Sequence, residues 1–314
     1  MRRAVLAAAL ILAATAATAK ETEPAPAAAP VKAASTVSGV TVTGEKSNPL
    51  VDKTTEFVRR RLPTSQNEQY ARFHDPICVR VLGLPEGFDA FVTQRIVALA
   101  RQVGASVDEA ANCKTNVEVL FSTRPQAQLD NVAQKREFLL GFFYRAQYKA
   151  TKTFSRPIQS WYLTRNVGTD GIGAFELVDP HPYDPDDGKM PAVKGRPGSR
   201  LGNDMSSELV NSLIIADAKK VAGEPIGAVA DYVAVLALSR WRGLEKCSGM
   251  PTILNLMAED CDAADRPEAA TPEDVALLQG LYTVNPREGG SFQRAEIASA
   301  VRKAAAAEAR EAAK

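Results

Sequence analysis

Two short apolar runs, each beside a cysteine and separated by a helical pattern, most constrain how this chain can fold. The runs ICVRVLGL, over Ile77–Leu84, and NVEVLFS, over Asn116–Ser122, have the length and β-branched content of buried strands. The segment between them carries apolar residues at helical spacing, namely Phe88, Val92, Ile96, Leu99 and Val103. A strand, a helix and a strand in this order predict a right-handed βαβ unit with two parallel strands.

Strand and helix patterns continue along the rest of the chain. A helix is predicted to begin near Pro125, and further strands are predicted over Pro157–Arg165 and Leu209–Ala216. The apolar face of that helix is expected to consist of Leu129, Val132, Leu139 and Phe143. Three more helices are expected, over residues 227–239, from Thr271 and from Ser291. These elements predict an α/β (α+β) fold, in which a mixed sheet starts with the βαβ unit and packs against helices.

Composition divides the chain into a leader, a tether and one folded domain. Residues 1–19 have the pattern of a secretory signal peptide, with two arginines, a short apolar run and a small-residue cleavage site. Residues 20–49 are predicted to form a flexible Ala/Pro-rich tether, since they lack hydrophobic periodicity. Residues 50–302 are predicted to form a single globular domain, and residues 303–314 a solvated helical tail. Residues 166–207, rich in Gly, Pro and Asp, are predicted to form a long loop.

The signal peptide predicts a periplasmic or secreted protein. No membrane span is expected after signal cleavage, because no later stretch is long and apolar enough. The chain carries 38 basic and 37 acidic residues, and loss of Arg2 and Arg3 changes its net charge from +1 to −1. This balance argues against nucleic acid as a partner.

In an oxidising compartment, the four cysteines predict disulfide bonds. Cys78 and Cys113 stand at the starts of the first two predicted strands, so they can pair if those strands are parallel neighbours. Cys247 and Cys261 would then close a loop of about 15 residues, which contributes roughly 3 kcal/mol on a chain-entropy model. A metal cluster is the alternative, but the chain has no CxxC, and these spacings fit no common zinc site.

Three polar features have a structural interpretation beside a functional one. Arg59-Arg60-Arg61 is either a binding patch or the solvated end of a short helix, where the helix dipole favours positive charge. The DPDDG segment at residues 184–188 lacks the Gly and Glu positions of a calcium loop, so we interpret it as a turn. His181 has no neighbouring ligand at metal spacing and is interpreted as a loop histidine.

Three segments in the last third of the chain resemble the catalytic half of metzincin-type zinc peptidases. Pro251–Leu256, PTILNL, looks like their Met-containing turn with Leu254 in place of Met. Thr271–Tyr282, TPEDVALLQGLY, looks like their last helix, and Ala230–Leu238 occupies the place of the zinc-binding helix. The resemblance implies a zincin-like domain. The chain also resembles an uncharacterised family of exported bacterial proteins, in the segments ICVRVLGLP, RPIQSWY and ADYVAVLALS.

The positions that match the zinc site do not carry its chemistry. In the metzincins, imidazoles one helical turn apart bind zinc, and an intervening glutamate is the general base. Here Ala230 and Ala234 stand at the first two ligand positions, the third falls at Arg240, and Asp231 is the one remaining carboxylate. The resemblance therefore implies a pseudoenzyme without metal or cofactor. A cleft lined by Asp231, Arg240 and Tyr282 would remain.

Other catalytic patterns are missing from the sequence, which has no GxSxG elbow, no P-loop and no GxGxxG after a strand. We therefore expect an exported non-catalytic protein with a binding or structural role in the cell envelope. Its partner would be a protein or a cell-wall component, neither of which the sequence identifies. The alternative is a divergent metal-dependent hydrolase with non-standard ligands, such as acidic residues or His181 of the long loop.

Overall fold

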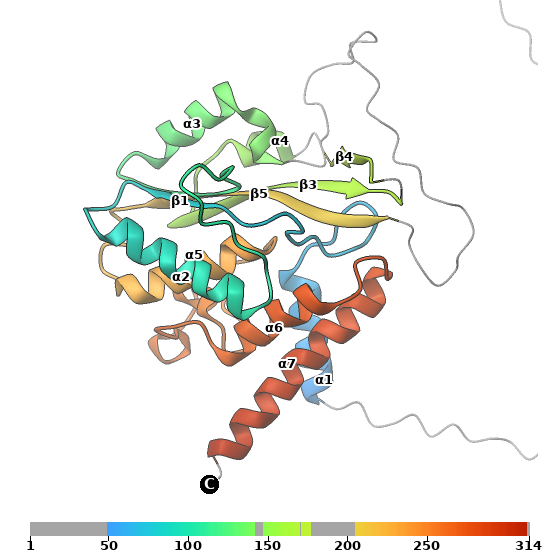
Figure 1. The fold of residues 1–314 in the computed structure, drawn as a ribbon. Helices are drawn as coiled ribbons and strands as arrows, with labels where there is room; N and C mark the ends of the chain where they lie inside the picture. The colour runs from blue at the N-terminus through green and yellow to red at the C-terminus, as the bar shows by residue number, and fades with distance from the viewer. Residues whose placement is uncertain (1–48, 142–146, 170, 177–204, 313–314) are drawn as a thin grey trace, which may run out of the picture. The chain divides into compact units, whose positions relative to one another are not determined.

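A five-stranded mixed sheet lies at the centre of the described chain (Figure 1). The computed structural model describes residues 49–141, 147–169, 171–176 and 205–312. In order across the sheet, the strands are β1 (Val79–Leu82), β2 (Val117–Ser122), β5 (Ser206–Asp217), β3 (Ile158–Val167) and β4 (Gly173–Phe175). β1, β2 and β5 are parallel, whereas β3 runs antiparallel to both β5 and β4. The α/β (α+β) class with a mixed sheet is confirmed, including the parallel pairing of the first two strands.

Several predicted features lie outside the described residues and stay predictions. They are the signal peptide, residues 20–48 of the tether, Phe143, the segment 184–188 and His181.

Helices cover both faces of this sheet (Figure 1). α2 (Phe88–Gln102) and α5 (Ile226–Leu238) pack against each other on one face. On the other face lie α3 (Pro125–Lys135), the 3-10 helix η1 (Glu137–Leu140) and the short α4 (Tyr148–Thr151). Every residue of α5 from Ala228 to Leu238 is buried, as expected for a helix that is apolar on all sides.

The C-terminal third folds against the face that carries α2 and α5. It contains the 3-10 helices η3 (Ile253–Met257) and η4 (Ala263–Asp265), followed by α6 (Pro272–Thr283) and α7 (Gly290–Ala312). α7 packs against α6 and against α1 (Pro49–Arg61). The start of α6 is a capping box, in which Thr271 accepts a hydrogen bond from the Asp274 amide and Asp274 accepts one from the Thr271 amide.

The Asp274 carboxylate also joins α6 to the turn at residues 251–256. It accepts a hydrogen bond from the Ile253 amide at 2.7 Å and another from the Thr252 hydroxyl. The two segments that resemble the metzincin turn and last helix are therefore in contact.

Both predicted disulfides are confirmed as pairings. Cys78 and Cys113 lie just before the neighbouring strands β1 and β2, with their Cα atoms 5.9 Å apart. Cys247 and Cys261 pair with their Cα atoms 4.9 Å apart. These disulfides indicate an oxidising compartment.

The predicted helix that begins near Pro125 is shorter than its apolar pattern suggested. α3 ends at Lys135, and Arg136 adopts a non-helical backbone, so Leu139 belongs to the separate η1. Leu139 still packs in the same hydrophobic cluster as Leu129 and Val132. The helical spacing of these apolar residues therefore reflects their burial in one cluster, although they belong to two separate helices.

The loop predicted over residues 166–207 contains strand residues at both ends. β3 continues to Val167, β4 follows at residues 173–175, and β5 begins at Ser206. The first residues of β5 are polar, which concealed the strand. Their side chains have partners on the neighbouring strand β3. Glu208 forms an ion pair with Arg165 at 2.6 Å, and the Ser207 hydroxyl donates a hydrogen bond to the Asn166 side chain at 2.8 Å.

The arginine triplet at the end of α1 divides into two kinds of side chain. Arg59 and Arg60 are exposed and pair with Glu56, as expected for a solvated helix end. Arg61 is buried and donates to the Lys246 carbonyl at 2.6 Å. The prediction of a solvated triplet is therefore wrong for Arg61, because the chain after α5 covers it.

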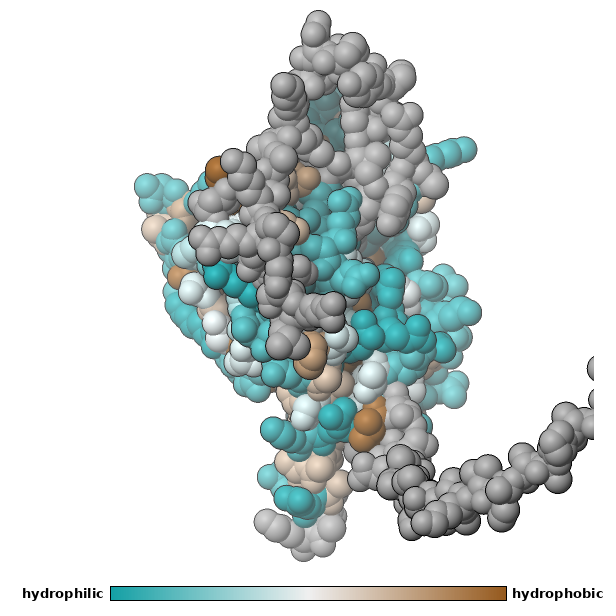
Figure 2. All heavy atoms as spheres, turned by 90° about the vertical axis from the view of Figure 1, so that its right-hand side faces the viewer, coloured by the Kyte–Doolittle hydropathy of each residue, from teal (hydrophilic) through white to brown (hydrophobic). Residues whose placement is uncertain are grey.

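The coloured face in Figure 2 is mainly hydrophilic, and its apolar residues are scattered. Within the described ranges, no helix has the length and hydropathy needed to cross a bilayer.

Candidate functional site

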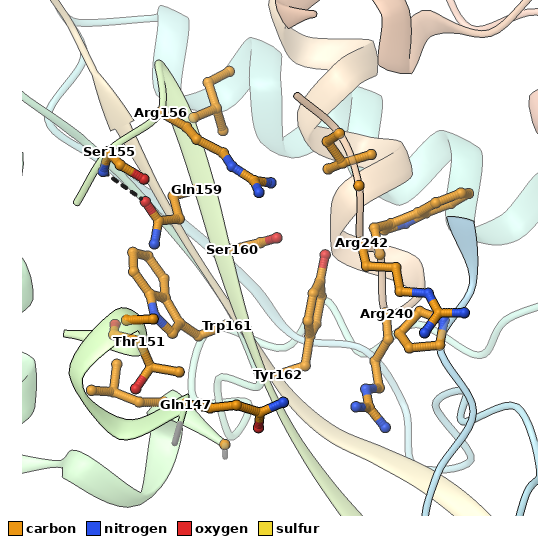
Figure 3. Close-up of a pocket in the computed structure, with 18 of the residues that line it drawn as sticks. Gln147, Thr151, Ser155, Arg156, Gln159, Ser160, Trp161, Tyr162, Arg240 and Arg242 are labelled. Atoms are coloured by element: carbon orange, nitrogen blue, oxygen red, sulfur yellow. Dashed lines mark hydrogen bonds between the residues drawn. The ribbon is translucent and has the colours of Figure 1, made fainter. Parts of the chain in front are cut away.

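A cavity of about 680 Å³ lies beside the first half of β3. Its walls come from three other parts of the chain: residues 63–66 after α1, residues 240–244 after α5, and residues on either side of α4. Figure 3 shows Ser160 and Tyr162 pointing from β3 toward the side of Arg240, and Gln159 and Trp161 pointing to the opposite side. The cavity therefore follows the edge of the strand and reaches both of its faces.

The strand edge in this cavity is open among the described residues. β4 pairs with β3 only at residues 165–167, so no described strand pairs with Ile158–Leu163 on the side away from β5. The Pro157 carbonyl accepts from the Asp217 amide of β5, whereas the Ser212 amide of β5 donates to Asn116, away from β3. Residues of an antiparallel strand alternate in this respect, so the amides and carbonyls of Ile158, Ser160 and Tyr162 point away from β5. At Tyr162 this edge is covered, because Gly141 packs so closely that a Cβ atom there would clash with the Tyr162 carbonyl oxygen. The open part of the edge is therefore at Ile158 and Ser160.

Positive charge gathers in the lining of this cavity. Its described lining residues include Arg156, Arg240 and Arg242, and no carboxylate, imidazole or thiol. Arg156 pairs with Glu245 at 2.9 Å, and both side chains are partly exposed. Arg242 donates to the carbonyls of Arg60 and Arg59, at 3.1 and 2.6 Å.

Arg240 is the buried cation of the site. Its side chain is 9% exposed and lies 3.8 Å from the carboxylate of Glu176, which is itself buried. Burial lowers the pKa of the Arg240 guanidinium to about 10, although Glu176 opposes this effect. The guanidinium is therefore still charged at neutral pH. Glu176 also accepts hydrogen bonds from the Gln66 amide at 2.9 Å and the Thr164 hydroxyl at 2.8 Å, so it is held in place.

Three aromatic side chains make the walls rigid. The Tyr162 hydroxyl donates to the Leu236 carbonyl at 3.0 Å, and burial raises the pKa of this phenol. The indole nitrogens of Trp161 and Trp241 donate to backbone carbonyls at 2.7 and 2.9 Å. Because each polar ring atom already has a partner, the rings keep their orientation whether or not the cavity is filled.

The three residues predicted to line a cleft are not brought together. Arg240 lines the cavity beside β3, but Asp231 and Tyr282 do not. Asp231 forms a two-bond ion pair with Arg95 of α2 and accepts from the Ala270 amide at 2.9 Å. The Tyr282 hydroxyl donates to the Leu238 carbonyl at 2.9 Å. Asp231 and Tyr282 thus connect α5 to its neighbours.

The positions that match metzincin zinc ligands hold packing residues and the buried arginine. Ala230 and Ala234 have no exposed surface. In the part of the chain that the structure describes, no three residues among His, Cys, Asp and Glu are grouped as metal ligands. The Nδ1 atom of His74 lies 3.7 Å from the Glu208 carboxylate, and the Asp75 carboxylate also acts on this imidazole.

Comparison of the chain with known protein families, with curated proteins and with solved structures finds no match. The zincin-like resemblance therefore stays a prediction.

Sequence reasoning missed Arg156, Ser160 and Arg242 as site residues. The segment RPIQSWY contains the first two, and its alternation of apolar and polar residues identified it as a strand. No local pattern indicates which edge of a strand stays open, because that depends on which segment pairs beside it.

Proposed function

We propose that this protein is an exported, non-catalytic binding domain of the cell envelope, and that its cavity beside β3 holds an extended peptide segment. The observation that carries this proposal is the open edge at Ile158 and Ser160. An extended peptide can add to such an edge, where backbone hydrogen bonds provide affinity and nearby pockets provide specificity.

The geometry of the cavity supports this mode of binding. The strand edge is enclosed between residues 240–244 on one side and residues around α4 on the other. A peptide in this groove would form backbone hydrogen bonds on one side and place alternate side chains toward each wall. Because the aromatic walls are already held by hydrogen bonds, little ordering of the protein would be needed on binding.

The chemistry of the described lining supports recognition rather than turnover. A serine nucleophile such as Ser160 would need a base within hydrogen-bond reach. The described lining offers hydroxyls, amides, indoles and arginines, and none of these is a general base at neutral pH. The two disulfides fit a protein that works in an oxidising compartment.

A zincin-like origin belongs to the same proposal. Arg240, which stands at the third zinc-ligand position of the resemblance, lines this cavity. A cleft that kept its strand edge but lost its metal ligands would bind peptides without cleaving them.

The test uses the mature protein and a phage-displayed pool of random twelve-residue peptides. An enriched peptide is then measured against Ser160→Pro, which removes the edge amide, and against Ser160→Ala, which keeps it. A net backbone hydrogen bond is worth about 0.5–1.5 kcal/mol, so we expect Ser160→Pro to weaken binding by about tenfold and Ser160→Ala by less than about twofold. Proline is tolerated at strand edges, and melting temperatures check that both variants are folded.

Hydrogen exchange of the Ser160 amide in the wild-type protein provides a second measurement. Bound peptide should slow this exchange. The proposal is overturned if no peptide is enriched, or if an enriched peptide neither protects this amide nor distinguishes the two variants.

A further inference from the structure

We infer that the peptide which this site takes is acidic, and that it extends from the β3 edge past Gly243 into a second, cationic cavity. This inference rests on the proposed peptide groove and adds the charge and the path of the ligand. The second cavity has a volume of about 490 Å³ and lies between α1 and residues 243–250. Gly243 lines both cavities.

One segment, residues 242–246, lines both cavities and is held by hydrogen bonds to the end of α1. The Arg242 amide donates to the Arg61 carbonyl at 3.0 Å. The Arg61 side chain in turn donates a hydrogen bond to the Lys246 carbonyl of this segment at 2.6 Å. Gly243, at the point shared by both cavities, has a φ of 66°. This left-handed conformation favours glycine, so the residue that lines both cavities has no side chain.

Cationic side chains outnumber carboxylates along this path. The first cavity presents three arginines and no acid in its described lining. The second presents Lys53, Arg60, Arg61 and Lys246, against Glu56 and Glu245. Glu56 is already paired with Arg59 and Arg60, and Glu245 with Arg156. One more carboxylate, Glu176, lies behind Arg240.

This concentration of positive charge is local, since the whole chain carries 38 basic and 37 acidic residues. A patch of one sign on a nearly neutral protein attracts a ligand of the opposite sign and increases its rate of association. The ligand that complements both cavities is therefore anionic.

The backbone of β3 favours an acidic peptide over another polyanion. The open edge offers amides and carbonyls in alternation, and a second peptide backbone can satisfy both. A polyphosphate has acceptors only, so it would leave the edge carbonyls without donors. Glu56 and Glu245 would also repel a uniformly charged polymer, whereas a peptide can place neutral residues beside them.

The test measures fluorescence anisotropy of the mature protein with two labelled ten-residue peptides. One peptide alternates Glu with Val, and its counterpart has Gln in place of Glu. The variant Lys53→Glu/Lys246→Glu reverses two exposed charges of the second cavity. The control variant Lys114→Glu/Lys135→Glu makes the same charge change at exposed positions that line neither cavity.

We expect the wild-type protein to bind the Glu peptide about tenfold more tightly than the Gln peptide, and added salt to reduce this difference. The Lys53→Glu/Lys246→Glu variant should weaken Glu-peptide binding by about tenfold and leave Gln-peptide binding within about twofold. The control variant should change neither affinity by more than about twofold.

The outcomes separate this inference from the proposed function. Equal binding of both peptides, with sensitivity to Ser160→Pro, would leave the peptide groove standing and overturn the acidic path. Equal weakening by the test and control variants would overturn the path through the second cavity. Tighter binding of inorganic polyphosphate than of the Glu peptide would identify a polyanion site instead. Failure of both peptides, together with failure of the phage selection, would refute the groove itself.

Discussion

The ion pair between Arg95 and Asp231 provides the sharpest test of how α5 is held. The Arg95 Nε atom donates to Asp231 Oδ1 at 2.6 Å, and a second bond joins Nη2 to Oδ2. The Asp231 side chain is 9% exposed and that of Arg95 is 42% exposed. The pair is therefore intermediate between a surface salt bridge and a buried one.

The partial burial of this ion pair determines how much it should stabilise the protein. Exposed pairs contribute about 0.2–1 kcal/mol, whereas removal of one partner from a buried pair costs about 3–5 kcal/mol. Asp231→Ala also removes the acceptor of the Ala270 amide, so we expect it to lower the free energy of unfolding by about 2–3 kcal/mol. Arg95→Ala should cost about 1–2 kcal/mol, because water can reach part of the remaining carboxylate.

A double-mutant cycle measures the interaction itself. Urea unfolding of wild type, both single variants and the double variant can be followed by fluorescence of the buried Trp161 and Trp241. We expect a coupling energy of about 1–2 kcal/mol, and peptide binding should not change. A coupling energy below about 0.5 kcal/mol, or a loss of peptide binding in a folded Asp231→Ala variant, would refute this structural role for Asp231.

Two further predictions concern protons and metal. Burial, with nearby Arg72, lowers the pKa of His74 below its usual 6.5, although Glu208 opposes the shift. The imidazole therefore binds a proton more readily in the unfolded chain, so the free energy of unfolding should fall as the pH drops through about 6.5. His74→Asn should make this fall smaller, which urea titrations of both proteins at pH 5 and 7.5 can measure. The same fall in both proteins would contradict this prediction. The side chains of Ala230 and Ala234 are buried methyl groups, which cannot bind a metal ion. Mass spectrometry should therefore find substoichiometric zinc, and EDTA should leave the melting temperature unchanged. One zinc per chain would support the divergent hydrolase instead.

Local patterns in the sequence predicted most of the helices and strands and both disulfides, but not β4, the polar start of β5 or the end of α3 at Lys135. The βαβ start follows from two apolar runs and a helical repeat, and the pairing of Cys78 with Cys113 follows because parallel neighbours begin at the same edge of a sheet. The helix from Thr271 was predicted from its cap, which the structure contains. The helix and its cap depend on residues close together in the sequence, whereas the disulfide followed from the expected parallel pairing of two strands, across a sequence separation of 35.

The tertiary structure decided which side chains form a site. The sequence marked Asp231 as a cleft residue, but it pairs with Arg95, 136 residues away, because packing of α2 on α5 brings the two together. The cavity beside β3 exists because β4 covers only the far end of that strand, and because residues 240–244 fold back against the end of α1. Strand partners and charge partners are determined by contacts between residues far apart in the sequence. The open edge at Ile158 and Ser160, and the arginines beside it, could therefore be recognised only in the folded chain.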